Sequence, residues 1–388
     1  MTERIYYNDS YRRLFRARIA EVSLDGRSVY LNQTAFYPSS GGQPFDTGRL
    51  GGAKVVDVVD EGERIAHIVE GAAGAVGEEV EGEIDWARRF DHMQQHTGQH
   101  LLSATFVDVL GAATVSFHLG DTVSTIELDI PALDAEAAAR VERRTNERVR
   151  QAHPVTVAFR DASEDLGLRK ATERTGTIRL VEIEGVDRSA CGGTHVRSTA
   201  EIGCVLLRRQ EKIRGRVRIE FVCGDRALRA AREDFATLSE AARMLATPMR
   251  DVPASALVLK QRLEEAEKAR RKLAGELAAA RGLRAWEETQ AGGDGKKRRV
   301  VRAAALDDEV RAEATAFTSR PGALYLALCE APAAVLLAVS DEVRPTAGER
   351  IKQALADLGG RGGGSARMAQ ASLSDAARLS RAEELLLA

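Results

Sequence analysis

The stretch Trp86–Gly111, WARRFDHMQQHTGQHLLSATFVDVLG, marks the point where the character of the chain changes. Its apolar residues recur at helical spacing, and Gly111 suits the left-handed residue that ends many helices, so we predict one helix here. His92, His96 and His100 follow one another at intervals of four, which places neighbouring pairs on a shared helix face. Spacing favours neither pair, and all three cannot share one face because residues eight apart diverge by roughly 80°.

Short alternating segments separated by glycine turns precede this helix, in residues 1–85. Ala17–Val22 and Val55–Val59 alternate apolar and polar residues, and a turn dipeptide ending in glycine follows each of them. Such alternation, broken by such turns, is typical of β-hairpins. We therefore predict a small β-barrel at the amino end of the chain.

The residues after the helix alternate between strand and helix patterns. We expect a strand pair at Thr114–Phe117 and Val123–Ile130, an amphipathic helix at Asp134–Gln151, and further strands up to Val222. The predicted fold class is α+β. We divide the chain into four parts: a barrel (1–85), an α/β domain (86–227), a helical hairpin (228–290) and a small α/β domain (291–388).

The third of these parts carries two apolar stripes. Leu259, Leu263, Leu273 and Leu277 recur with 4-3 spacing, although Arg270 falls on the same seam. This pattern fits an antiparallel hairpin or a dimeric coiled coil, and the short run with its arginine favours the hairpin. A homodimer through the carboxyl-terminal region stays open. We interpret residues 290–299 as a charged linker and residues 359–364 as a glycine loop.

Composition limits the class of protein. The 388 residues carry 56 Lys and Arg against 58 Asp and Glu, so a nucleic-acid binder of this kind must gather its basic residues in patches. The chain shows neither a membrane-spanning apolar run nor a signal-peptide pattern at its start. Its four cysteines are too few for a disulfide framework. We therefore expect a cytoplasmic protein without a membrane partner, and expect Cys204, Cys223 and Cys329 to be small core residues.

The segment Cys191–His195, CGGTH, adds a second pair of potential metal ligands. Thiolate and imidazole are the ligands that Zn²⁺ prefers, and one cysteine with three histidines would complete a tetrahedral site. Glycines 192 and 193 would let the backbone turn between the ligands. Four protein ligands suggest a structural ion, whereas a working site keeps one position open, and the sequence leaves both interpretations standing.

Three strings together resemble a known family: TAFYPSSGGQPFDTG (Thr34–Gly48), HTGQH (His96–His100) and CGGTHV (Cys191–Val196). They resemble the editing domain shared by alanyl-tRNA synthetases and their free-standing AlaX-type relatives. In that family the two histidine-bearing motifs hold zinc, which implies His96, His100, Cys191 and His195 as ligands of one ion per chain and excludes His92.

The resemblance also implies an activity and its residues. It implies hydrolysis of serine, with glycine as a second candidate, from mischarged alanine tRNA. Thr34 would recognise the serine hydroxyl, and Gln43 would lie beside the substrate in the loop of Gly41 and Gly42. The family's synthetases often carry an acidic residue where this chain has Ser39 or Ser40. Asp46 is the nearest replacement, although a turn-capping aspartate is at least as good an interpretation.

The tail resembles the RNA-binding domain associated with DHH phosphoesterases, through GGRGGGSARMAQAS. It implies tRNA contact by Gly362 and Gly363. Nothing in the chain resembles a synthetase's ATP-dependent domain, so we expect no amino-acid activation.

Several residues are open to two interpretations. His118 suits an acid–base group or a loop histidine bonded to backbone. The basic run near the motif would contact tRNA phosphate or form a solvated hairpin face; its candidate contacts are Arg208, Arg209, Arg214 and Arg216. As a whole, the chain is predicted to be a zinc-dependent aminoacyl-tRNA hydrolase. The alternatives are a non-catalytic tRNA-binding factor stabilised by zinc and, less favoured, a phosphoesterase.

Overall fold

The structure is a computed structural model that describes residues 1–173 and 175–388. The chain forms two compact units, Met1–Ser239 and Glu240–Ala388, which we treat separately. Among the described residues, no helix combines the length and the apolar character needed to cross a bilayer.

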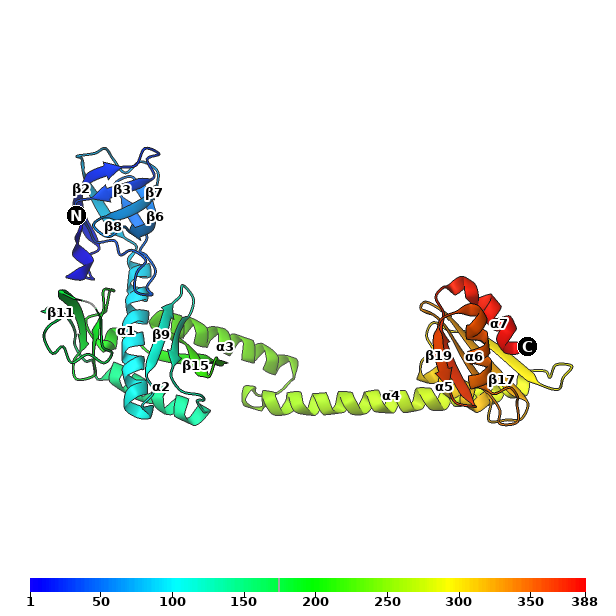
Figure 1. The fold of residues 1–388 in the computed structure, drawn as a ribbon. Coiled ribbons are helices and arrows are strands. Elements are labelled where there is room, and N and C mark those ends of the chain that lie inside the picture. Colours follow the sequence, from blue (N-terminus) through cyan, green and yellow to red (C-terminus); the bar gives the residue numbers. More distant parts are fainter. Residues whose placement is uncertain (174) are drawn as a thin grey trace. The chain divides into compact units, whose positions relative to one another are not determined.

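The first unit begins with a closed β-barrel, as the sequence predicts (Figure 1). Its strands follow the spatial order β2-β3-β7-β6-β5-β8. Alternate residues of β2, from Phe15 to Ile19, point into the barrel core. The strands are β2 (Leu14–Val22), β3 (Ser28–Leu31), β5 (Gly48–Leu50), β6 (Ala53–Asp60), β7 (Ile65–Glu70) and β8 (Glu79–Ile84). Outside it, β1 (Glu3–Arg4) pairs with β4 (Gln33–Thr34), and η1 (Ile5–Tyr7) follows β1.

Helix α1 (Trp86–Leu110) leaves the barrel and runs past the sheet that contains β9 and β15 (Figure 1). Asp85 caps its first turn by accepting a hydrogen bond from the Arg88 amide, and Gly111 ends it with a φ of 65°, as the sequence predicts. Gly98 lies in its interior, where a Cβ would approach Sγ of Cys223 to 2.3 Å. The missing side chain lets the helix pack closely against β15.

A buried ion pair joins α1 to the loop that follows β4. Arg89 and Asp46 are both fully buried, and Nε of Arg89 lies 2.9 and 3.0 Å from the two carboxylate oxygens. The same guanidinium donates to the backbone oxygens of Ser10 and Ala35. Asp46 also accepts a hydrogen bond from the Tyr37 amide at 2.6 Å. One side chain thus fixes the helix against two loops of the barrel.

Two antiparallel sheets and a second helix complete the part of the first unit around α1. The four-stranded sheet has the order β14-β15-β10-β9, and the three-stranded sheet has the order β11-β12-β13. Helix α2 (Ala135–Arg150) and α1 share one apolar core with the four-stranded sheet. The strands are β9 (Thr114–Leu119), β10 (Ser124–Leu128), β11 (Val155–Asp161), β12 (Thr177–Ile183), β13 (Asp187–Ala190), β14 (Val205–Ile213) and β15 (Arg216–Cys223), with η2 at Thr199–Ile202.

Helices α3 (Gly224–Met244) and α4 (Val252–Glu288) fill the predicted helical part, with η3 (Met249–Asp251) between them. Pro253 lies in the first turn of α4, where its missing amide leaves no helical bond unmade. The leucines of the α4 stripe, such as Leu263 and Leu273, are exposed. The antiparallel pairing of the two helices and the homodimer both stay predictions.

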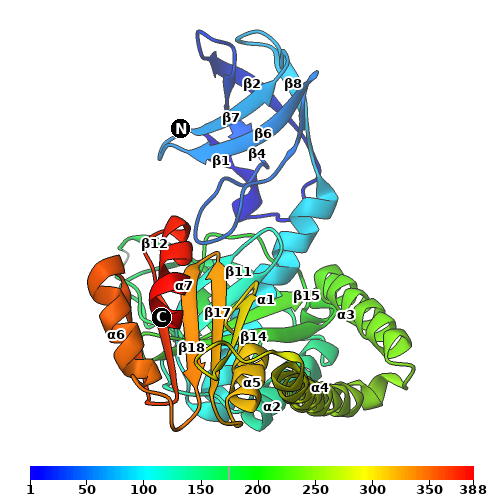
Figure 2. The same cartoon turned by 90° about the vertical axis from the view of Figure 1, so that its right-hand side faces the viewer.

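The second unit is built around a five-stranded sheet in the order β16-β17-β18-β20-β19 (Figure 2). Alternate residues of β17 pack into two apolar cores on the two faces of the sheet. Leu324 packs with α6 and α7, while Tyr325 packs with α5 and with the last turns of α4. The elements are β16 (Lys297–Arg302), α5 (Asp308–Phe317), β17 (Ala323–Glu330), β18 (Ala333–Val339), α6 (Ala347–Leu358), β19 (Arg361–Gly364), β20 (Met368–Ser372), η4 (Ala376–Arg378) and α7 (Leu379–Leu387).

Three sequence expectations are wrong. Residues 361–364 form the edge strand β19 and not a loop; a Cβ at Gly362 would lie 2.6 Å from Cα of Ala371, so glycine permits this close pairing. The predicted linker ends in a strand, because Lys297 and its neighbours pair with β17. Cys204 is exposed immediately before β14, whereas Cys223 and Cys329 are buried as expected.

The buried ion pair generates the first prediction. Asp46→Asn leaves the Arg89 guanidinium charged and unpaired in the interior, so we expect the free energy of unfolding to fall by about 3–5 kcal/mol. Urea unfolding of the full chain, followed by circular dichroism, measures this change. Glu21→Gln, which breaks the exposed Arg64–Glu21 pair, is the control and should cost under about 1 kcal/mol. Equal losses of unfolding free energy in Asp46→Asn and Glu21→Gln would show that the buried pair stabilises the fold no more than the exposed one.

The second prediction concerns acid and the barrel histidine His67. Burial lowers the pKa of His67 from 6.5 to about 4. Between these values the unfolded chain binds a proton that the folded chain does not, so stability falls as the pH drops from 6.5 to 4. A difference of one in pKa corresponds to about 1.4 kcal/mol, so the loss amounts to roughly 3 kcal/mol.

His67→Gln removes this titration. We expect the stability advantage of the wild type over the variant to shrink by that amount between pH 7 and pH 4, as measured from urea unfolding at a series of pH values. If the difference in stability between the wild type and His67→Gln stays constant with pH, burial does not lower the pKa of His67.

Candidate metal centre

Four side chains from two distant segments meet beside α1. His96 and His100 lie one turn apart on that helix, and Cys191 and His195 come from the segment that follows β13. Their potential ligand atoms all lie within 4.8 Å of one another. Sγ of Cys191 is 3.4 Å from Nε2 of His96 and 3.3 Å from Nε2 of His195. Tetrahedral zinc ligands lie about 3.3–3.8 Å apart, so the spacing fits such an ion.

Each histidine of the group has a polar partner for its other ring nitrogen. Nδ1 of His96 lies 2.8 Å from Oε1 of Gln43, and Nδ1 of His195 lies 3.2 Å from the Thr97 hydroxyl. Nδ1 of His100 lies 2.9 Å from a carboxylate oxygen of Asp187. With Nδ1 donating in each ring, Nε2 keeps its lone pair for a metal. The donor set therefore fits a cation such as zinc.

Gln43 and Gly193 explain how His96 is held. The Gln43 side chain also accepts a hydrogen bond from the Thr194 amide and donates one to the Thr194 hydroxyl, so both ends of its carboxamide are fixed. A Cβ at Gly193 would lie 2.2 Å from Cε1 of His96. The sequence predicts a sharp turn at Gly193. In the structure, glycine is needed at this position because a side chain would occupy the space of the His96 imidazole.

The electrostatics of the group favour a thiolate at Cys191 and a neutral imidazole at His195. Burial alone would raise the pKa of Cys191, but the charges of His96 and His195 and the hydrogen bond from His100 lower it well below its ordinary value. Burial and the charge of His96 lower the pKa of His195 to about 3. A thiolate and a neutral imidazole are the forms that bind a metal.

Asp187 and His100 form a buried acid–base pair at the edge of the group. Burial opposes the charged form of both, but their mutual hydrogen bond raises the pKa of His100 to about 9 and lowers that of Asp187 to about 2. Arg169 and Ser189 donate to the same carboxylate at 2.6 and 2.9 Å. Asp187 therefore stays ionised and holds the His100 ring in one orientation.

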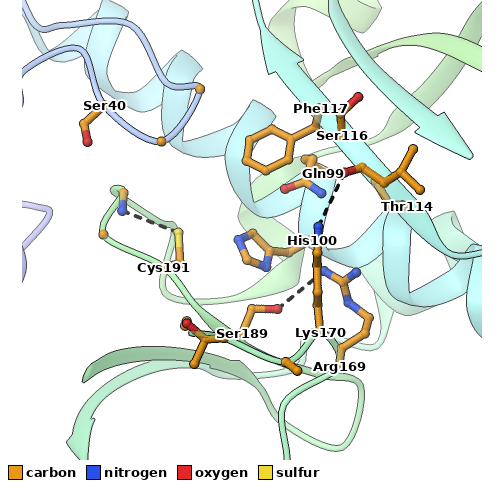
Figure 3. A pocket seen from close by; sticks show the side chains of 18 of the residues that line it. Ser40, Gln99, His100, Thr114, Ser116, Phe117, Arg169, Lys170, Ser189 and Cys191 are labelled. Carbon is orange, nitrogen blue, oxygen red and sulfur yellow. Dashed lines mark hydrogen bonds between the residues drawn. The ribbon is translucent and has the colours of Figure 1, made fainter. Parts of the chain in front are cut away.

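A cavity of 540 Å³ opens directly on the cluster. His100 and Cys191 are part of its wall, with the loop that carries Ser40 on one side and Phe117 of β9 on the other (Figure 3). Gly41 and Gly42 also line it. Phe117 of β9, 36% exposed, lies over Gly42, where a Cβ would approach its ring to 2.9 Å. Arg169 and Lys170 supply positive charge at the wall. The site thus combines an apolar ring, two cations and a group of metal ligands.

Not every residue that the sequence proposes reaches this cavity. Thr34 is buried in contact with His67, whose Nδ1 donates to the Val29 carbonyl, so the Thr34 hydroxyl donates to His67 Nε2 at 2.8 Å. The same hydroxyl accepts the Phe36 amide. His118 is exposed on β9 outside the cavity lining. His92 is buried on α1 outside the metal group, with its pKa lowered to about 4 by burial.

The basic run does not line this cavity, and its contact with tRNA stays a prediction. It forms β14 and β15, and β14 occupies the edge of its sheet opposite to β9, roughly 14 Å away at normal strand spacing. Arg208 pairs with Asp234, and Arg216 pairs with Asp129 at 3.2 Å. The remaining candidates are Arg209, paired with Glu211, and Arg214, at the hairpin turn. Gly362 and Gly363 line a separate cavity in the second unit.

The sequence reasoning missed Gln99, Asp187, Arg169 and Phe117. Gln99 lies inside the HTGQH string and could have been found from it. Asp187 lies four residues before Cys191, but only the pairing of β13 with β12 directs it toward His100. Arg169 reaches the site from a loop, so no local pattern marks it.

Comparisons of the sequence with known proteins identify relatives of this chain. Residues 178–220 match the family described as the threonyl and alanyl tRNA synthetase second additional domain. The alanine–tRNA ligase of Pyrobaculum neutrophilum is 36% identical over 393 residues, which cover 95% of this chain and 42% of the ligase.

Two shorter relatives match a little more than half of this chain at a similar identity. The alanyl-tRNA editing protein Aarsd1 of Danio rerio is 36% identical over 219 residues, covering 55% of this chain and 53% of the relative. That of Bos taurus is 38% identical over 214 residues, covering 53% and 48%. The chain thus spans about half the length of these relatives or less. It is a relative of the alanyl-tRNA editing proteins and the alanine–tRNA ligases, as the three motifs indicate.

Proposed function

We propose that this chain removes wrongly attached serine, and glycine as a second substrate, from alanine-accepting tRNA by hydrolysing the aminoacyl ester. The observation that carries the proposal is the group of His96, His100, Cys191 and His195, of which His100 and Cys191 line a cavity. We propose one zinc ion per chain as its occupant. The likeness to alanyl-tRNA editing proteins supports the substrate.

The residues of the site suit ester hydrolysis. A bound zinc ion would polarise the ester and anchor the substrate's polar groups. An aminoacyl ester is already activated, so orientation and exclusion of competing water matter more than a strong nucleophile. Phe117 and the Gly41–Gly42 loop enclose the cavity on two sides. Gln43 fixes the His96 ring, and Asp187 fixes the ring of His100, which lines the cavity. Asp46 is bonded to Arg89 in the interior and is therefore not free to act as a general base.

Recognition of tRNA is proposed at the cavity wall. Lys170 is exposed there, with Nζ 3.4 Å from the Val115 carbonyl, and Arg169 lies beside it. Both cations suit the phosphates that precede the terminal nucleoside, and Phe117 offers an apolar face to its base. Arg209, Arg214, Gly362 and Gly363 are retained as proposed contacts farther along the tRNA.

The metal prediction tests the cluster itself. We expect the purified chain to hold about one zinc ion after dialysis, and Cys191→Ala with His195→Ala to reduce this content to near zero because two ligands are lost. His92→Gln is the matched control, since His92 lies on the same helix outside the group, and should retain the ion. Atomic emission measures the zinc content of all three proteins and so shows which side chains bind the ion. Retention by the double variant would disprove the assignment.

The activity prediction tests the reaction. We expect the wild type to release serine from Ser-tRNA(Ala) much faster than alanine from Ala-tRNA(Ala), because a site that bonds a hydroxyl rejects the analogue without it, by up to roughly 10⁴-fold. The variant with Ala at positions 191 and 195 should lose this activity. If it deacylates normally, or if the wild type binds the tRNA in a filter assay without deacylating it, the chain is a non-catalytic tRNA-binding factor.

A further inference from the structure

Gln99 is a buried polar side chain in the cavity wall that the reaction described above does not use. Its side chain is 2% exposed, and Nε2 donates to the Ser103 hydroxyl at 2.8 Å. Oε1 has no hydrogen-bond partner among the residues that the structure describes. Figure 3 shows this oxygen between the rings of Phe117 and His100, two residues that line the cavity together with Gln99.

The carboxamide is held in place from behind. Ser103 accepts both from Gln99 and from the Thr114 hydroxyl, each at 2.8 Å. Because Gln99 lies on α1 directly before a residue of the metal group, the rigid helix fixes its distance from that group. An acceptor that is buried, fixed and unpaired costs free energy unless a donor arrives. The geometry therefore calls for a ligand with a hydrogen-bond donor at this point.

We propose that Oε1 of Gln99 accepts a hydrogen bond from the side-chain hydroxyl of the seryl group, which makes Gln99 a specificity-determining residue. The inference rests on the proposed editing function and deepens it. A hydroxyl satisfies the buried acceptor, whereas the methyl group of alanine leaves it unpaired, so the site favours serine over alanine. Glycine leaves this acceptor unpaired as alanine does, so Gln99 acts on serine only and does not account for the removal of glycine.

The position of Thr34 supports this assignment. The family resemblance gives the recognition of serine to Thr34, but its hydroxyl already donates to His67 and accepts from the Phe36 amide. Thr34 is also absent from the residues that line the cavity. Gln99 offers what Thr34 lacks here, which is an unpaired acceptor on a residue that lines the cavity.

The test compares seryl and glycyl esters on the same alanine tRNA. Gln99→Met keeps the size of the side chain and removes its acceptor. We expect kcat/KM for Ser-tRNA(Ala) to fall about 10- to 100-fold, with little change for Gly-tRNA(Ala), because only serine loses a hydrogen bond. Zinc content and the urea midpoint confirm that each variant is folded. Thr34→Val is the control and should leave the ratio of the two substrates unchanged.

Every outcome decides the proposal. Equal losses on both esters, no loss on either, or a changed ratio in Thr34→Val but not in Gln99→Met would overturn it. If Gln99→Met does not fold, Ser103→Ala replaces it: this variant frees the carboxamide, and a selective loss on serine supports the proposal while an unselective effect overturns it. If the wild type releases neither amino acid, the editing function itself fails, which the wild-type reaction alone reveals.

Discussion

The buried ion pair between Arg89 and Asp46 is the contact on which the geometry of the site depends. Arg89 belongs to α1 and Asp46 to the loop that carries Gln43. Two turns farther along the same helix, His96 receives its orientation from Gln43. Helix and loop are therefore joined twice, once by charge and once by a hydrogen bond to a metal-ligand candidate. A shift of the barrel against α1 would disturb both joints together.

The sequence predicts most of the first unit because its patterns are local. Asp85, Gly111 and the alternation in the barrel strands mark elements that fold as their neighbours suggest. The position of the basic run could not be predicted in this way, since the order β14-β15-β10-β9 results from pairing between distant segments. The edge strand β19 was missed because glycine has low strand propensity, and only its close approach to β20 explains its presence there.

The site shows the same division between local and tertiary information. The motifs identify His96, His100, Cys191 and His195, which the structure brings together. The residues that orient these rings come from three separate places: a loop for Gln43, the helix itself for Thr97, and a strand for Asp187. No spacing rule connects them. Thr34 illustrates the limit of a resemblance, because its hydroxyl partner, His67, is decided by the packing of this particular barrel.

Gly98 gives the helix at the centre of the site an unusual dependence on its surroundings. A glycine within a helix costs about 1 kcal/mol relative to alanine, and β15 occupies the space that its side chain would need. Helix α1 accordingly draws much of its order from tertiary contacts and not from its own propensity. Amide protons on both sides of Gly98 would then exchange through the same opening event as those of β15, so the binding pocket and the core of this unit form one cooperative element.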